Sequence, residues 1–231
     1  MRKDSPRRPF TRVLIANRGE IAVRIARTLR EMQVESVAVF SDADTDAVHA
    51  QVADVAVPIG RSAASASYLN IAALIAAAKD SGAQAVHPGY GFLSERAAFA
   101  RAVEDAGLTW IGPSPATQEL LGDKLAARRA VADAGVPIVP GLLVAVDADD
   151  LPKPAAVGYP AMLKAAAGGG GRGMRRVDSP EQLAASLAGA RREAQAAFGD
   201  PTLYLERLIE PARHVEVQLL GDRHGNLACL G

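Results

Sequence analysis

The chain has little cysteine, few aromatic residues and no excess of charge of either sign. Cys229 is its only cysteine, which excludes an intramolecular disulfide and favours a cytoplasmic protein. Aromatic residues make up only 4% of the 231 residues. Lysine and arginine together number 26, as do aspartate and glutamate, so the formal net charge is zero. This balance gives no electrostatic argument for a nucleic-acid partner or a membrane surface, and we expect neither.

Long apolar runs are missing as well. No run approaches the ~18 residues of a transmembrane helix. Residues 1–9, MRKDSPRRP, are basic but lack the apolar stretch of a secretory signal. A transit peptide would be longer and richer in serine, so we expect these residues to be a disordered extension. For Cys229, a small buried residue near the end of a strand is a better interpretation than a catalytic thiol.

Short apolar runs alternate with helical patterns from residue 10 to about residue 112. Such alternation predicts an α/β fold with a Rossmann-like parallel sheet and helices on both faces. Ligands bind beyond the carboxyl ends of the strands in sheets of this kind. The loops 17–20 and 87–95 follow two predicted strands, which makes both loops candidates for a site. The expected strands are 12–16, 35–40, 54–58, 83–87 and 108–111, and the expected helices are 20–32, 68–79 and 95–106.

The regular alternation of predicted strands and helices ends at Gly112-Pro113. Two short helices are expected first, followed by a proline-punctuated stretch at residues 136–140 and a small unit of three strands and one helix. Two further strands around Gly221-Asp222 predict a hairpin. The expected helices are 114–121, 123–134 and 180–198, and the expected strands are 159–164, 174–177, 202–208, 214–220 and 226–230.

The densest chemical signal is the segment KAAAGGGGRGM at residues 164–174. Its consecutive glycines allow positive φ and close approach to a ligand, and successive backbone N–H groups can form an anion-binding concavity. Lys164 adds a point charge suited to phosphate. The segment lacks the Gly-Lys-Ser/Thr of a P-loop. A flexible linker is the alternative, but strand patterns bound the segment on both sides, so phosphate binding is the favoured interpretation. The four glycines are Gly168, Gly169, Gly170 and Gly171.

The turn NRGE at residues 17–20 invites a dinucleotide-binding interpretation. It carries no G-x-G-x-x-G pattern, so we do not expect NAD binding. The interest of this turn lies instead in its position directly after the first predicted strand.

Several short motifs occur in order along the chain, and together they are specific where any one alone would be weak. They are IANRGEIA (15–22), SYLN (67–70), HPGYGFLSE (87–95), GP (112–113), GDK (122–124), GVP (135–137), the glycine segment (164–174) and RHVE (213–216). With these motifs, the chain from about Phe10 to Gly231 resembles the biotin carboxylase family. That family is the ATP-grasp component of acyl-CoA carboxylases and pyruvate carboxylase.

The resemblance implies a nucleotide site built from separate parts of the chain. Lys124 and Lys164 correspond to two lysines of the family's nucleotide site, and Lys164 corresponds to the one on the α- and β-phosphates. The four glycines correspond to the lid that closes over the nucleotide and excludes water. Glu206, Arg207 and Ile209 correspond to the hinge that recognises adenine, partly through backbone groups.

Two more parts of the site are implied in the same way. His214 corresponds to a histidine that contacts the nucleotide. The loop 87–95 corresponds to the mouth of the site, with Tyr90 and Gly91 facing biotin and the phosphates.

Simpler structural explanations exist for these residues. Lys124 is also explained as a solvated lysine at a helix start, Glu206 as an exposed acid on an edge strand, and His214 as a surface residue. A helix-capping turn, in which Ser94 and Glu95 open the next helix, is the alternative for the loop that contains them.

The resemblance also implies a domain organisation. Residues 10–121 correspond to the N-terminal, pre-ATP-grasp domain, and residues 122–231 to an incomplete ATP-grasp domain. The latter comprises a lid subdomain at about 137–208 and the first strands of the C-terminal subdomain. Arg27 and Glu31 match positions of the family's dimer contact, so we expect a homodimer in the full-length form. An ordinary exposed ion pair is the alternative for these two residues.

The implied enzyme activates bicarbonate with ATP and Mg²⁺ as carboxyphosphate and carboxylates biotin on its carrier domain. It would act in an acyl-CoA carboxylase, together with a carboxyltransferase subunit. The family's catalytic residues and acidic metal ligands follow the segment that corresponds to Gly231. We therefore expect no catalytic or metal-binding residue within this chain and little or no carboxylase activity of the chain alone. The alternatives are a non-catalytic nucleotide-binding or subunit-interaction module, or a fragment of another ATP-grasp ligase such as a carbamoyl-phosphate synthetase.

Overall fold

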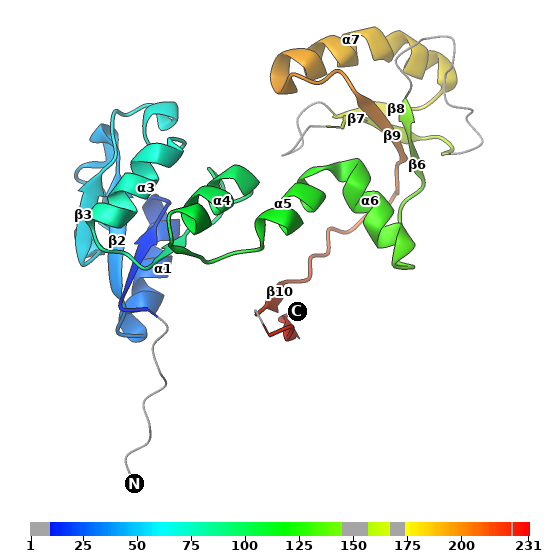
Figure 1. Ribbon diagram of the computed structural model, residues 1–231. Helices are drawn as coiled ribbons and strands as arrows, with labels where there is room; N and C mark the ends of the chain where they lie inside the picture. The colour runs from blue at the N-terminus through cyan, green and yellow to red at the C-terminus, as the bar shows by residue number, and fades with distance from the viewer. Residues whose placement is uncertain (1–9, 145–156, 167–173, 223) are drawn as a thin grey trace. The chain divides into compact units, whose positions relative to one another are not determined.

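The computed structural model describes residues 10–144, 157–166, 174–222 and 224–231. The chain forms two compact units, residues 1–127 and 128–231 (Figure 1).

The first unit is built on a five-stranded sheet in the order β3-β2-β1-β4-β5. Every neighbouring pair in this sheet is parallel, as the alternation of strands and helices predicts. The strands are β1 (Arg12–Ile15), β2 (Glu35–Phe40), β3 (Val55–Pro58), β4 (Ala85–His87) and β5 (Thr109–Trp110).

Both faces of this sheet are covered, which explains why its strands are apolar on both sides. Along β1, Leu14 belongs to one core cluster, whereas Val13 and Ile15 belong to the other. The first cluster includes Leu74 of α3 and Phe99 of α4, and the second includes side chains of α1. The helices are α1 (Gly19–Glu31), α2 (Val48–Val52), α3 (Ile71–Asp80), α4 (Ala97–Asp105) and α5 (Pro115–Gly122), with 3₁₀ turns at Asp42–Asp44 and Ala64–Ala66.

Two helix starts differ from the sequence prediction by more than one residue. Helix α3 begins three residues late because the side chain of Asn70 accepts a hydrogen bond from the backbone N–H of Ala73 at 3.2 Å and caps the helix there. Helix α4 begins after Arg96, which makes no side-chain capping bond. The alternative in which Ser94 and Glu95 cap α4 is therefore wrong, because the helix starts beyond both residues.

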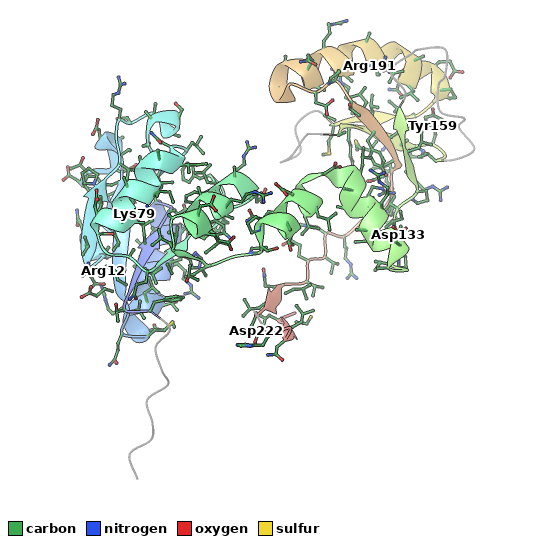
Figure 2. The ribbon with its side chains drawn as sticks, in the orientation of Figure 1. Arg12, Lys79, Asp133, Tyr159, Arg191 and Asp222 are labelled. Carbon is green, nitrogen blue, oxygen red and sulfur yellow. The ribbon has the colours of Figure 1, made fainter. Side chains whose placement is uncertain are left out.

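The second unit contains a four-stranded antiparallel sheet in the order β6-β9-β7-β8. Helix α7 lies across one face of this sheet (Figure 1). Ser179 caps the start of α7, and Gly199 ends it in the left-handed conformation, with φ 75°. Tyr159, labelled in Figure 2, packs against the core between sheet and helix. The elements are β6 (Gly141–Val144), β7 (Ala161–Ala165), β8 (Met174–Val177), β9 (Leu203–Arg207) and α7 (Pro180–Phe198), after α6 (Lys124–Asp133), which begins before the border between the units.

The chain continues into a short hairpin of β10 (Leu219–Gly221) and β11 (Leu227–Cys229). The predicted hairpin is present, but its first strand is shorter than expected and does not include His214. Cys229 is exposed, so the expectation of a buried cysteine is wrong. Among the helices that the structure describes, none has the length and apolar character needed to cross a membrane.

Strand β6 was not predicted, and its first residue depends on having no side chain. Gly141 lies opposite Glu206 in the register of β6 and β9. A Cβ atom there would lie 1.9 Å from the hydroxyl oxygen of Tyr204 and 2.9 Å from the carbonyl oxygen of Leu205. Only glycine fits without displacing the tyrosine ring and the neighbouring strand.

We expect the substitution Gly141→Ala to lower the free energy of unfolding of the second unit by about 1–3 kcal/mol, the usual cost of overpacking. Gly189→Ala in the interior of α7 is the control, because its Cβ would meet only the end of the Arg175 side chain, at 3.5 Å. We expect this control to stabilise the unit by up to about 1 kcal/mol, through helix propensity. Denaturant unfolding measures both changes, and equal effects of the two variants would contradict the packing explanation.

Candidate functional site

The side chain of Asn17 joins the two loops at the carboxyl end of the first sheet by hydrogen bonds. Its side chain is 1% exposed, and its amide nitrogen donates to the carbonyl oxygens of Pro88 at 2.7 Å and Tyr90 at 2.8 Å. Its amide oxygen accepts from the backbone N–H of Arg18 at 2.9 Å. The structure thus brings the turn after β1 into contact with the loop after β4, the two segments that the strand pattern selects.

The loop after β4 has a backbone that requires glycine. Gly89 and Gly91 have φ of 64° and 74°, in the left-handed region. A Cβ atom on Gly89 would also lie 2.7 Å from the Ile21 side chain. Tyr90 between them is 65% exposed, and its hydroxyl donates to Glu20 at 2.8 Å, which raises the pKa of Tyr90. The loop therefore presents Tyr90 and Gly91 at an open surface above the strand ends.

His87, at the end of β4, helps to shape the same loop. Its Nδ1 atom accepts a hydrogen bond from the backbone N–H of Gly89 at 3.0 Å. Burial lowers the pKa of His87, which favours the neutral ring that can accept this bond.

A buried tyrosine supports the loop from behind. The ring of Tyr68 stacks on Phe92 with 5.1 Å between centroids, and its hydroxyl donates to Asp44 at 2.7 Å and accepts from the backbone N–H of Ser41 at 3.0 Å. Burial, followed by the bond to Asp44, raises the pKa of Tyr68 to about 12. Burial alone would raise the pKa of Asp44, but hydrogen bonds from Tyr68 and Ser41 and the charge of Arg18 outweigh it and lower this pKa.

A second cluster of charges lies in the second unit. Lys164 is opposite Tyr204 in the register of β7 and β9, and Met162 is opposite Glu206. Because side chains alternate along a strand, these four residues share one face of the sheet, and Leu163 faces the α7 core on the other. On β7 and β9 this polar face therefore carries one lysine and one glutamate, in diagonal positions.

These two residues form a close ion pair. The Nζ atom of Lys164 lies 2.7 Å from Oε1 of Glu206, and their side chains are 25% and 19% exposed. The other oxygen of Glu206 lies 3.5 Å from a guanidinium nitrogen of Arg128 on α6. The carboxylate thus stands between two cations, and the cluster of three carries a net positive charge.

Three predicted site residues follow this cluster along the chain. The Nε atom of Arg207 donates to the carbonyl oxygen of Val157 at 2.8 Å. Ile209 is 53% exposed. His214 lies 3.1 Å from Glu216, with both side chains at least 80% exposed. All three residues are exposed at the surface.

The remaining predictions concern four glycines and the side chain of Lys124, which are not among the described parts of the structure. Gly168, Gly169, Gly170 and Gly171 lie outside the described residues. Lys124 is the first residue of α6, and the position of its side chain is not among those described.

Arg128 and Tyr204 lie in the same cluster but were not predicted from the sequence. The guanidinium of Arg128 lies 5.0 Å from the centroid of the Tyr204 ring and donates a hydrogen bond to the carbonyl oxygen of Val139. The available signal was the spacing of Arg128 four residues after Lys124, which places both on one side of a helix.

The described residues do not by themselves form a complete magnesium site. Mg²⁺ takes octahedral oxygen ligands, which at nucleotide sites include phosphates and water besides one or two carboxylates. Within the described part of the chain, no group of three or more histidine, cysteine, aspartate or glutamate side chains could hold a metal. Glu206, the acid nearest to Lys164, is engaged with two cations.

Two family models match the chain in succession. The biotin carboxylase N-terminal domain matches residues 9–118, and the carbamoyl-phosphate synthase L chain ATP-binding domain matches residues 123–231. The biotin carboxylase of Halalkalibacterium halodurans is 48% identical over 223 residues, which is 96% of this chain and 49% of that protein. The chain belongs to the biotin carboxylase family. It matches the N-terminal part of that family and spans about half the length of this relative.

Solved structures agree with this family. The biotin carboxylase–βγ-ATP complex from Campylobacter jejuni superposes with a TM-score of 0.89 at 44% identity, over 95% of this chain and 50% of that one. The biotin carboxylase domain dimer of Hydrogenobacter thermophilus 2-oxoglutarate carboxylase, in complex with MgADP, ADP and bicarbonate, gives 0.89 at 42% identity, over 97% and 50%. These biotin carboxylases share both the parallel sheet and the following sheet with this chain.

The fragment of a carbamoyl-phosphate synthetase is not supported as an alternative. The second family model carries that name, but residues 9–118 match the N-terminal domain of biotin carboxylase. Biotin carboxylases match both parts together, over 95–96% of this chain.

The support that Tyr68 gives to the loop predicts a dependence of stability on pH. Tyr68→Phe removes a hydroxyl with two partners, so we expect the unmodified protein to be about 1–2 kcal/mol more stable than the variant at pH 7. The pKa of Tyr68 rises from 10.0 to about 12 on folding, so this advantage is complete below pH 10 and is lost as the pH rises toward 12. Denaturant unfolding between pH 7 and pH 11 measures the difference.

Tyr90→Phe is the control, because Tyr90 is exposed and we expect a change within about 0.5 kcal/mol. A stability difference between the unmodified protein and Tyr68→Phe that stays constant up to pH 11 would show that the titration of Tyr68 is not involved.

Proposed function

We propose that this chain is the nucleotide-binding part of a biotin carboxylase and that its second unit holds ATP. The observation that carries the proposal is the Lys164–Glu206 pair on the polar face of β7 and β9. A lysine at the end of a strand, directly before a run of glycines, supplies a mobile positive charge where phosphate groups would lie.

Each predicted residue would contact a different part of the nucleotide or its surroundings. Lys164 would contact the α- and β-phosphates, and Lys124 would approach the nucleotide from the start of α6. The four glycines from Gly168 to Gly171 would close over the phosphates, where the exclusion of water strengthens charge interactions.

The adenine would be recognised at the end of β9. Glu206, Arg207 and Ile209 would form the hinge beside it, and His214 would contact the nucleotide. Tyr90 and Gly91 would lie toward biotin and the phosphates. In this proposal residues 10–121 form the N-terminal domain and residues 122–231 the incomplete ATP-grasp domain, with the lid at about 137–208.

The relatives support ATP as the ligand. The Campylobacter jejuni structure is a complex with βγ-ATP, and the Hydrogenobacter thermophilus structure contains MgADP and bicarbonate. The similarity of this chain to both structures, each with a TM-score of 0.89, supports a ligand of the same kind.

For the whole protein we propose the carboxylation of biotin on a carrier domain, with ATP and bicarbonate and through carboxyphosphate. It would act in the cytoplasm as part of an acyl-CoA carboxylase, with a carboxyltransferase subunit and as a homodimer. Magnesium would be held by residues other than those described here. Incubation of the full-length protein with ATP, bicarbonate and biotin tests the activity, and ATP hydrolysis that is independent of biotin and bicarbonate would contradict it.

The substitution Lys164→Met is expected to weaken ATP binding at least about tenfold, because it removes a charge-assisted contact to the phosphates. Calorimetric titration of the purified chain with ATP measures the dissociation constant. Lys79→Met is the control, since Lys79 is an exposed lysine of α3 in the first unit (Figure 2). ATP affinity that is equal in both variants would exclude Lys164 from the nucleotide site.

A further inference from the structure

Arg128 occupies a fixed position beside the Lys164–Glu206 pair. Its guanidinium donates to the carbonyl oxygen of Val139, lies 5.0 Å from the centroid of the Tyr204 ring and lies 3.5 Å from Oε2 of Glu206. Its side chain is only 21% exposed. A planar guanidinium with a ring on one side and a carbonyl at its end is held in one orientation.

The two cations contact different oxygens of one carboxylate. Lys164 is 2.7 Å from Oε1, and Arg128 is 3.5 Å from Oε2. Lys164 therefore has a partner that it would have to leave before its ammonium group could turn to a phosphate.

The free energy needed to separate Lys164 from Glu206 depends on Arg128. The Glu206 side chain is 19% exposed, and a carboxylate with so little solvent is destabilised when it loses its only cation. With Arg128 in place, Glu206 keeps a positive partner after Lys164 has moved. Without Arg128, the same carboxylate would hold Lys164 more tightly.

We propose that Arg128 is a positioning residue of the nucleotide site, which keeps Glu206 paired and thereby releases Lys164 for the phosphates of the nucleotide. This inference rests on the proposed function of the second unit. It assigns to Arg128 an effect on the phosphate part of the ligand, and none on the nucleoside part.

The test compares ATP with adenosine, which lacks the phosphates. In calorimetric titrations of the chain, Arg128→Met is expected to raise the dissociation constant of ATP about tenfold. The affinity for adenosine is expected to change less than about twofold, because Glu206 stays paired with Lys164 in this variant. Arg128→Lys, which keeps the charge, should restore most of the affinity for ATP. Arg129→Met, an exposed arginine on the same helix, is the matched control and should leave both affinities unchanged.

A double substitution separates positioning from a structural role. In the Lys164→Met background no lysine has to be released, so Arg128→Met should have little further effect on ATP binding. Additive losses in the double variant would overturn the inference. So would an equal loss of ATP and adenosine affinity in Arg128→Met, or no loss of either. If the unmodified chain does not bind ATP, the proposed function fails together with this inference. If it does bind ATP and Arg128→Met binds equally well, only this inference fails.

Discussion

The polar face of the second sheet depends on a single carboxylate. Glu206 neutralises part of the charge of Lys164 and Arg128, and all three side chains are at least three-quarters buried. Two cations this close, without the carboxylate, would repel each other in an environment with little water. With it, the sheet can carry an excess of positive charge on one face while the α7 core covers the other. The proposed nucleotide site and the packing of the sheet therefore depend on the same carboxylate.

In the first unit, two neutral side chains hold the loops at the ends of the strands. Asn17 satisfies the carbonyl oxygens of Pro88 and Tyr90, and Tyr68 satisfies Asp44 and the backbone of Ser41. These bonds hold two loops, both of which contain left-handed residues, above the strand ends. The buried polar groups of the loops are thereby hydrogen-bonded. Neutral hydrogen bonds thus fix the loops of the first unit, whereas ion pairs fix the polar face of the second sheet.

The sequence predicted the regular elements well, because their apolar periodicity decides them. The borders of β2, β8 and α7 agree with the prediction, and the parallel sheet follows from the alternation of strands and helices. Strand β6 was missed because its pairing with β9 is set by partners distant in sequence. The exposed Cys229 and the short β10 show that an apolar run alone does not determine burial. Lys164 and Glu206 are predicted as site residues from the family motifs, but their contact with Arg128 could not be predicted, since it depends on where α6 meets the sheet.

The central claim is that nucleotide binds on the polar face of the second sheet, at the end of β9. Photolabelling with 8-azido-ATP, followed by mass spectrometry of the digested chain, tests it most directly, because the azide reports the position of the adenine. The account predicts labelled peptides that contain residues 203–209, with labelling suppressed by excess ATP. Labelling confined to residues 10–121, or labelling that excess ATP does not reduce, would contradict it.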